Sequence, residues 1–168
     1  FKYLAIVGCY CYNKTIVKKP KSHTITNQRA FFDYSILQEF VAGIVLTGAE
    51  TKSLRFSRGS LKGAFVTIKN GEAWLNNMQI MPMSTNSAYL PELEQTRARK
   101  LLLKRKELTE LTRAKDQGSA IVALKMRTNG RYIKVVIATA KGKKAYDKRA
   151  KIKERDTNRD IHRDIKNR

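Results

Sequence analysis

Two Asn-Gly dipeptides constrain the fold of this chain more than any other feature. Asn70-Gly71 and Asn129-Gly130 each lie between segments rich in apolar and β-branched residues. Because asparagine and glycine tolerate the positive φ angles of a type I′ turn, both dipeptides predict tight β-hairpins. The paired segments are residues 61–68 with 73–80, and residues 120–127 with 132–138.

Two further strands are predicted upstream of the hairpins. Residues 31–37 are rich in aromatic and β-branched side chains, and residues 40–46 form a second run of this kind. Gly43 indicates a β-bulge or a bend in the second run. Six short strands joined largely by tight turns favour a mainly β fold built as a closed antiparallel barrel. Closure removes the exposed edges that a small sheet would otherwise have to protect.

One segment has helical rather than strand periodicity. Residues 97–115 place Leu101, Leu108 and Leu111 on one stripe, which predicts a long amphipathic helix. The outer face of this helix would carry Arg99 and other basic residues. We therefore expect α-helix to flank the barrel.

The rest of the chain divides into a barrel domain and two flanking segments. A short helix is predicted around residues 50–56, and a long loop over residues 82–95, which contain two prolines. The barrel domain is predicted at residues 25–140. We expect residues 1–24 to be an unstructured extension, and residues 141–168 to be a basic tail that is disordered when free.

Charge indicates the class of partner. The chain carries 35 lysine and arginine residues against 14 aspartate and glutamate residues, a formal net charge of +21. The tail has 12 basic and 5 acidic residues and too few apolar groups to offset the entropy lost on ordering. Such a charge is typical of proteins that bind nucleic acid or an anionic membrane surface. No segment has the roughly 18 apolar residues of a membrane span, so we expect no membrane partner.

Catalytic and metal chemistry are not indicated. Cys9 and Cys11, with only His23 and His162 elsewhere, lack the four-ligand spacing of a closed zinc site. Two thiols one residue apart make no disulfide framework, which favours a reducing compartment. No Ser/His/Asp set, glycine-rich phosphate loop or pair of acids in a recognisable frame is present. We expect neither an enzyme nor a cofactor, metal or small-molecule substrate.

Six short motifs follow one another in order along the chain. They are Asn27-Gln28-Arg29-Ala30, Ala42-Gly43-Ile44, Gly48-Ala49-Glu50-Thr51-Lys52-Ser53-Leu54-Arg55, Asn70-Gly71-Glu72 with Trp74, Arg97-x-Arg99-Lys100-Leu101-Leu102-Leu103, and Ala140-Lys141-Gly142-Lys143-Lys144 with Asp147-Lys148-Arg149. At these separations, from about residue 25 to the C-terminus, the chain resembles the SsrA-binding protein (small protein B) family, the partner of transfer-messenger RNA.

The resemblance implies an oligonucleotide-binding-like barrel with flanking helices. It also implies that the chain binds the tRNA-like domain of transfer-messenger RNA and helps deliver it to ribosomes stalled on an mRNA without a stop codon. The tail would enter the empty mRNA channel of the ribosome near the decoding centre. We expect a monomer in the bacterial cytoplasm or in an organelle. A general basic RNA-binding or ribosomal protein with the same barrel is the alternative.

The resemblance assigns two sets of candidate residues. Asn27 matches an asparagine implicated in RNA contact, although a residue that caps a turn would also fit. Leu102 could lie in the core or on the RNA-facing surface, and Glu50 could contact RNA or form an internal ion pair. The RNA-binding candidates are Asn27, Arg29, Glu50, Lys52, Arg97, Arg99, Lys100 and Leu102. The ribosome-engaging candidates are Gly142, Lys143, Lys144, Asp147, Lys148, Arg149 and Ile165.

Two positions depart from the family pattern. Val41 stands where the family commonly has a glutamate implicated in RNA binding, and valine cannot make its hydrogen bonds. We expect that contact to be lost or moved. Phe32 stands where the family often has a histidine. A phenyl ring can stack on a base but cannot hydrogen-bond to it.

Overall fold

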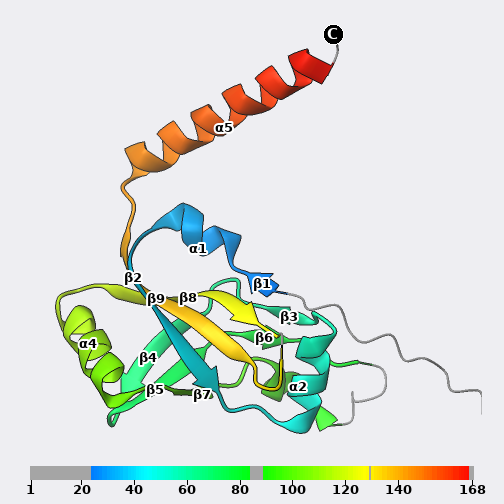
Figure 1. Ribbon diagram of the computed structural model, residues 1–168, viewed down its shortest axis with the longest axis vertical. Coiled ribbons are helices and arrows are strands. Elements are labelled where there is room, and N and C mark those ends of the chain that lie inside the picture. The colour runs from blue at the N-terminus through cyan, green and yellow to red at the C-terminus, as the bar shows by residue number, and fades with distance from the viewer. Residues whose placement is uncertain (1–23, 84–88, 129, 167–168) are drawn as a thin grey trace, which may run out of the picture.

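The computed structural model describes residues 24–83, 89–128 and 130–166 (Figure 1). A barrel makes up the body of the protein, and one long helix, α5 (Ala145–Lys166), projects away from it. Residues 1–23 of the extension predicted at residues 1–24, with both cysteines and His23, lie outside the described residues. Thr24, predicted to be unstructured, instead begins a strand.

Six strands of the described chain close the barrel. Their order is β8, β4, β5, β7, β2 and β9, and pairing of β9 with β8 completes the ring. β1 extends the sheet beside β8, while β3 and β6 form a separate two-stranded ribbon. The strands are β1 (Thr24–Thr26), β2 (Tyr34–Ile44), β3 (Gly59–Ser60), β4 (Phe65–Lys69), β5 (Glu72–Asn76), β6 (Gln79–Ile80), β7 (Arg99–Leu102), β8 (Ala120–Arg127) and β9 (Lys134–Gly142). The predicted closed antiparallel barrel is confirmed.

Both Asn-Gly hairpins are present. β4 and β5 pair on either side of Asn70 and Gly71, whose φ angles are 52° and 72°. β8 and β9 pair on either side of the second turn, in which Gly130 has a φ of 91°. The φ angles of Asn70 and Gly71 are those that an Asn-Gly turn requires, so the local sequence specifies the first turn. The second connection is longer than the predicted tight turn, because β8 ends at Arg127 and β9 begins at Lys134 rather than at residue 132.

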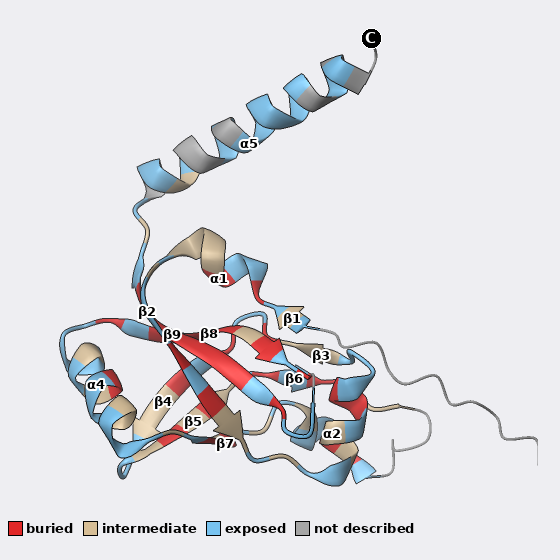
Figure 2. Ribbon diagram, viewed as in Figure 1, coloured by how far each residue is buried: buried red, intermediate tan, exposed pale blue. Residues whose placement is uncertain are grey.

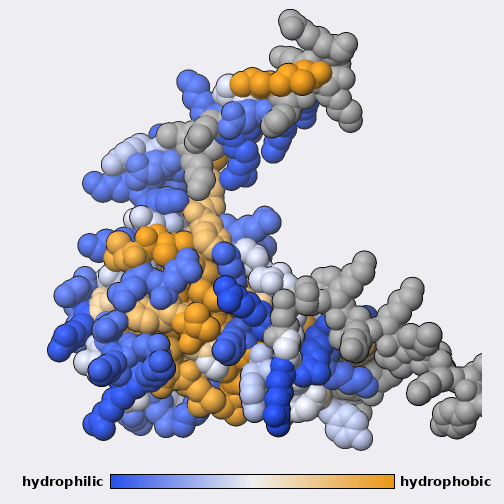
Figure 3. Space-filling model, in the orientation of Figure 1, coloured by the Kyte–Doolittle hydropathy of each residue, from blue (hydrophilic) through white to orange (hydrophobic). Residues whose placement is uncertain are grey.

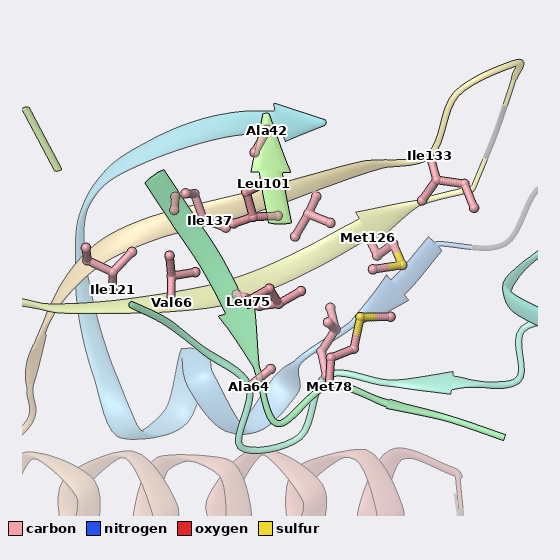
Figure 4. Close-up of a cluster of buried hydrophobic side chains, with 14 of the residues drawn as sticks. Ala42, Ala64, Val66, Leu75, Met78, Leu101, Ile121, Met126, Ile133 and Ile137 are labelled. Atoms are coloured by element: carbon pink, nitrogen blue, oxygen red, sulfur yellow. The ribbon is translucent and has the colours of Figure 1, made fainter. Parts of the chain in front are cut away.

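The core of the barrel is formed by the inward-facing residues of its strands. Leu75, Met126 and Ile137 are fully buried, and Leu111 of α4 (Arg105–Asp116) joins the same cluster. Side chains from different strands meet in Figure 4, where Leu75, Met126 and Ile137 are labelled. Figure 2 shows that burial follows the strands, whereas the described part of α5 is largely exposed.

The first predicted strand is wrong over its first three residues. Residues Gln28–Asp33 form helix α1, and β2 begins only at Tyr34. The side chain of Asn27 caps the helix, and Ala30 packs with residues of β8 and β9 in a second buried cluster. Capping and burial outweigh the strand propensity of the two phenylalanines in this segment.

The two strands predicted over residues 31–37 and 40–46 are one strand. β2 pairs with β9 along its length, and the register shifts between Ile36 and Gln38. This irregularity, rather than a bulge at Gly43, interrupts the period-2 pattern of the sequence. The long partner strand β9 carries the pairing across the interruption.

The helix predicted over residues 97–115 is wrong at its N-terminal end. Residues Arg99–Leu102 form β7, and helix α4 begins at Arg105. Leu101 is 3% exposed and Leu102 is 54% exposed, the alternation of a strand. β7 pairs with β5 on one side and β2 on the other, so its backbone closes the ring. These two ladders outweigh the helical spacing of the leucines, because an open ring would leave two unpaired edges.

Two smaller helices complete the body. α2 (Gly48–Arg55) confirms the short helix predicted around residues 50–56, and α3 (Glu92–Gln95) is a single turn inside the predicted long loop. Within the described ranges, no helix combines the length and the apolar composition needed to cross a membrane.

The tail continues directly from the barrel. β9 ends at Gly142, and α5 begins three residues later. Ion pairs at helical spacing lie along α5, with Asp156–Arg159 at 3.8 Å and Asp160–Arg163 at 3.4 Å. Such exposed pairs contribute only a few tenths of a kcal/mol each. Disorder of this segment in the free chain stays a prediction.

Adjacent leucines of β7 provide a test of the strand assignment. Leu101→Ala should lower the free energy of unfolding by about 2–5 kcal/mol, because it leaves a cavity in the core. Leu102→Ala, its matched control on the outer face, should change that free energy by about 0.5 kcal/mol or less. Urea denaturation followed by the fluorescence of the single tryptophan measures both values. Equal losses would contradict the alternation.

Candidate RNA-binding surface

Asn27 lies just before α1 and is almost fully buried, with 6% exposed. Its Oδ1 accepts a hydrogen bond from the N–H of Ala30 at 3.2 Å. Its Nδ2 donates to the carbonyl oxygens of Leu61 at 2.8 Å and Ala123 at 3.0 Å. Both amide N–H donors are therefore used inside the protein. The side chain caps α1 and ties it to the barrel, which agrees with the turn-capping alternative.

Arg29 lies two residues further on and projects from α1. Its side chain is 68% exposed, and its Nε lies 3.4 Å from Oδ2 of Asp33. A cavity of about 340 Å³ opens beside it, between α1 and strands β4 and β8. The cavity is lined by Asn27, Arg29, Ala30, Asp33, Tyr34, Gly63, Ala64, Phe65 and Val122. Charged and aromatic groups are thus brought together at the surface that α1 shapes.

Three other candidates form a buried ion cluster. Glu50 and Arg99 are fully buried, and Arg97 is partly exposed. Arg97 binds both carboxylate oxygens of Glu50, at 2.9 and 2.7 Å, and Nε of Arg99 donates to Oε1 at 2.9 Å. The remaining N–H donors of Arg99 bind backbone carbonyls of Met78, Glu94, Gln95 and Arg97. All five guanidinium donors are satisfied, which is what burial of this charge requires.

Glu50 also fastens the start of α2. Its Oε2 accepts from the backbone N–H of Thr47 at 2.8 Å, and the Thr47 hydroxyl accepts from the N–H of Glu50, a capping box. Burial raises the pKa of Glu50, but hydrogen bonds from Arg97, Thr47 and Arg99 and the charge of Arg99 outweigh it. The pKa of Glu50 therefore lies below its ordinary value. This cluster joins α2 to β7. It agrees with the alternative in which Glu50 forms an internal ion pair rather than contacting RNA.

Lys100 and Leu102 lie on the opposite, outward face of β7. Lys100 stands beside Trp74 of β5 and pairs with Glu72, while Leu102 stands beside Gly43 of β2. A Cβ on Gly43 would come within 3.3 Å of the Cβ of Leu102, so the glycine makes room for this leucine. The core alternative for Leu102 is therefore excluded.

Val41 lies on the same face of β2 as Gly43, two residues earlier, and is 48% exposed. Glu39, two residues earlier again, is also exposed. The strand thus keeps a carboxylate near the position where valine replaces the family's glutamate. Figure 3 shows apolar side chains gathered over the barrel, framed by hydrophilic residues.

The remaining candidates are spread over α2 and the tail. Lys52 is exposed on α2, and Lys144, Asp147 and Arg149 are exposed at the base of the tail. Ile165 is 67% exposed near the end of α5. Gly142 is the last residue of β9, and Lys143 and Lys148 touch α1.

The structure thus separates the RNA-binding candidates into three groups. Asn27 and Arg29 shape the surface at α1, Lys100 and Leu102 lie on the outward face of β7, and the buried ion cluster supports both β7 and α2. Sequence reasoning missed Asp33, whose carboxylate joins α1 to the tail. A lone acid between two aromatic residues carries no pattern that would have identified it.

The buried ion cluster predicts a specific dependence of stability on pH. Because its folded pKa is lowered, Glu50 stabilises the fold above its unfolded pKa of about 4.3. That contribution is lost as the pH falls through the folded pKa. Glu50→Gln should cost about 3–5 kcal/mol at neutral pH, since it leaves buried arginine charge uncompensated. It should also make the free energy of unfolding fall less steeply as the pH is lowered, because glutamine does not titrate.

Denaturant titrations from pH 7 to pH 3 measure this effect. Glu72→Gln is the matched control, because it removes an exposed ion pair, worth about 0–1 kcal/mol. Equal losses of unfolding free energy in the two variants would contradict the conclusion that Glu50 joins α2 to β7 through a buried ion cluster.

Comparison with known proteins identifies the family. The family model described as SmpB protein matches residues 24–167, which include both the barrel and the tail. An SsrA-binding protein of a Synechococcus species is 45% identical over 145 residues, covering 86% of this chain and 94% of the relative. An SsrA-binding protein of Streptococcus mutans is 43% identical over 152 residues, covering 90% and 97%.

A solved structure extends the match to three dimensions. A chain from the structure described as "tmRNA-SmpB: a journey to the center of the bacterial ribosome" is 40% identical, with a TM-score of 0.60. The match covers 73% of this chain and 85% of that chain. The chain belongs to the SmpB family of SsrA-binding proteins.

Proposed function

We propose that this chain binds the tRNA-like domain of transfer-messenger RNA and helps deliver it to stalled ribosomes for trans-translation. The single observation that carries the proposal is the family match, which spans the barrel and the tail without a break. The net charge of +21 supports it, because the partner is polyanionic. Ribosome rescue places the protein where bacterial-type ribosomes work, in the cytoplasm of a bacterium or in an organelle.

Two separate surfaces of the barrel suit a structured RNA, one on the outward face of β7 and the other at α1 beside β4 and β8. On β7, Lys100 can approach a phosphate while Leu102 and Trp74 offer apolar area to a base or sugar. At α1, the exposed side chain of Arg29, which pairs with Asp33 at 3.4 Å, can reach a phosphate, and the adjacent cavity can receive a splayed base beside Tyr34 and Phe65. On the outward face of β2, Val41 stands where the family commonly has a glutamate, so one hydrogen-bonding carboxylate is missing there. We assign the role of that carboxylate to Glu39 on the same face.

The tail is proposed to act on the ribosome rather than on transfer-messenger RNA. Its described side chains are mostly exposed, so α5 has little support from the barrel beyond its first turns. A helix of this kind is marginal alone and is stabilised by a partner that pairs with its charges. The empty mRNA channel, walled by phosphates, supplies such a partner to Lys148 and Arg149.

RNA binding tests the first half of the proposal. A gel shift with the tRNA-like domain should give salt-sensitive binding, with log K falling against log salt at a slope of about −4 for about five neutralised phosphates. Leu102→Ala should weaken this binding without changing the unfolding free energy. Ile165→Ala, an exposed aliphatic residue of the tail, is the control and should bind as the unmodified chain does. Equal affinity for a DNA duplex of the same length would refute recognition of RNA shape and favour a general basic binder.

Tail truncation tests the second half. Cutting the chain after Tyr146 should leave the melting temperature nearly unchanged, because none of the removed residues that the structure describes belongs to either buried cluster. RNA binding should weaken modestly through the loss of positive charge. Tagging of nascent chains on stalled ribosomes should collapse in a reconstituted translation system. Full tagging by the truncated chain would contradict the separation of roles, whatever its RNA affinity.

A further inference from the structure

Three arginines gather where α2 meets the connection between β8 and β9. Nη2 of Arg55, the last residue of α2, donates to the backbone carbonyl oxygen of Arg131 at 3.4 Å. Nη1 of Arg58, in the turn that follows α2, donates to the carbonyl oxygen of Pro82 at 3.0 Å. Figure 1 shows the β8–β9 connection turning beside α2. Contacts between segments far apart in the chain thus set the positions of Arg55 and Arg58.

The charge of these arginines is not neutralised within the protein. Among the described residues, no carboxylate is close enough to Arg55, Arg58 or Arg131 to form an ion pair, and all three residues are exposed. The arginines of the buried ion cluster, by contrast, share Glu50. A guanidinium has five N–H donors, so a bond to one backbone carbonyl leaves most of them available. Groups that are held in place by neutral acceptors and still carry their charge suit an external anion.

Two exposed aromatic rings accompany the arginines. Phe56 directly follows Arg55 and is 51% exposed, and Tyr132 directly follows Arg131 and is 68% exposed. The guanidinium carbon of Arg131 lies 5.5 Å from the centroid of the Tyr132 ring, within the range of a cation–π interaction. Rings beside arginines are typical of surfaces that bind unpaired nucleotides, because the rings stack on bases while the guanidinium groups bind phosphates. We call Arg55, Phe56, Arg58, Arg131 and Tyr132 the α2-end patch.

The α2-end patch is continuous with the outward face of β7. Lys134 follows Tyr132 by two residues and stands beside Gly43 of β2. Gly43 in turn stands beside Leu102 of β7. Two inter-strand spacings, roughly 10 Å in all, therefore separate Leu102 from Lys134. One RNA molecule that lies on β7 can contact the patch as well.

We propose that the α2-end patch is an additional RNA-binding site, which holds unpaired nucleotides of the RNA that lies on β7. The rings of Phe56 and Tyr132 stack on bases, and the arginines bind the phosphates of the same segment. Two separated contacts fix the direction of the RNA on the barrel, which a single contact does not. The identity of this RNA as transfer-messenger RNA rests on the proposed function, whereas binding of unpaired nucleotides by the patch does not.

Fluorescence anisotropy with a labelled oligouridylate of about 12 nucleotides tests the patch in the full-length chain. Tyr132→Ala should weaken binding by about fivefold or more, the loss that follows when a base loses its stacking ring. Tyr132→Phe should bind as the unmodified chain does, because the ring is kept. Since Tyr132 is exposed, the melting temperature should not change in either variant.

Tyr146→Ala is the matched control for the ring, because it removes a tyrosine of similar exposure, 64%, at the base of the tail. It should leave the affinity for the oligouridylate unchanged. An unchanged affinity in Tyr132→Ala, or an equal loss in Tyr146→Ala, would overturn the additional site.

Salt dependence tests the phosphate contacts of the patch. Arg55→Gln combined with Arg131→Gln should make the slope of log K against log salt less steep by about 1.4, because each phosphate contact with a single strand contributes about 0.7. Arg113→Gln combined with Lys115→Gln removes two exposed cations from α4, which lies at the opposite end of the barrel in Figure 1. This control should leave the slope unchanged. Equal changes of slope in the two double variants would indicate attraction by net charge alone and overturn the site.

The tRNA-like domain tests which RNA occupies the patch. Tyr132→Ala should weaken its binding by about the factor measured with the oligouridylate. Unchanged affinity for the tRNA-like domain, with oligouridylate binding weakened, would overturn the assignment of the patch to that RNA. If the unmodified chain does not bind the tRNA-like domain, the proposed function is refuted and the oligouridylate alone decides the patch. A polyglutamate peptide that binds as tightly as the oligouridylate, and depends equally on Tyr132, would assign the patch to an acidic protein instead.

Discussion

Closure of the barrel by β9 is the constraint on which the rest of the structure depends. β9 pairs with β2 on one side and with β8 on the other, so no strand edge of the ring stays open. Its residues from Val135 to Ala140 are buried on both faces, by the barrel core and by the cluster under α1. The same strand ends at Gly142, where the tail begins. One strand therefore defines the core, the position of α1 and the point from which the tail leaves.

Polar groups inside the body are used for positioning rather than for contact. The carboxylate of Glu50 joins the start of α2 to β7 through two arginines, and every N–H of Arg99 has an acceptor. Asn27 joins α1 to the barrel in the same way, through backbone carbonyls of distant segments. Because these groups are saturated, they hold Lys100, Leu102 and Arg29 in place without competing for RNA themselves. The motifs shared with the family thus contain exposed residues, such as Leu102, and the buried residues that hold them in place, such as Glu50 and Arg99.

The division between a rigid barrel and an exposed tail follows from burial. The barrel buries its apolar residues in two clusters, while the aliphatic residues Ile152, Ile161 and Ile165 of α5 are 45%, 50% and 67% exposed. A helix with so little tertiary support responds readily to charged partners. The contact between Asp33 and Lys148 links the two parts, because α1 both lines the cavity beside β4 and β8 and contacts the first turn of the tail.

Local chemistry in the sequence determined the two Asn-Gly hairpins, the mainly β class, the basic charge and the family, because each rests on short-range patterns. Tertiary structure decided what those patterns could not. Leu101, Leu108 and Leu111 fit a helix by spacing, but only pairing with β5 and β2 made residues 99–102 a strand and turned Leu102 outward. Phe31 and Phe32 favour a strand, yet the Asn27 cap and the buried Ala30 made them helical. The prediction that Arg99 lies on the outer face of a helix is wrong, because distant residues meet around it and bury it against Glu50. In each case the deciding free energy comes from partners far apart in the chain, which no local pattern contains.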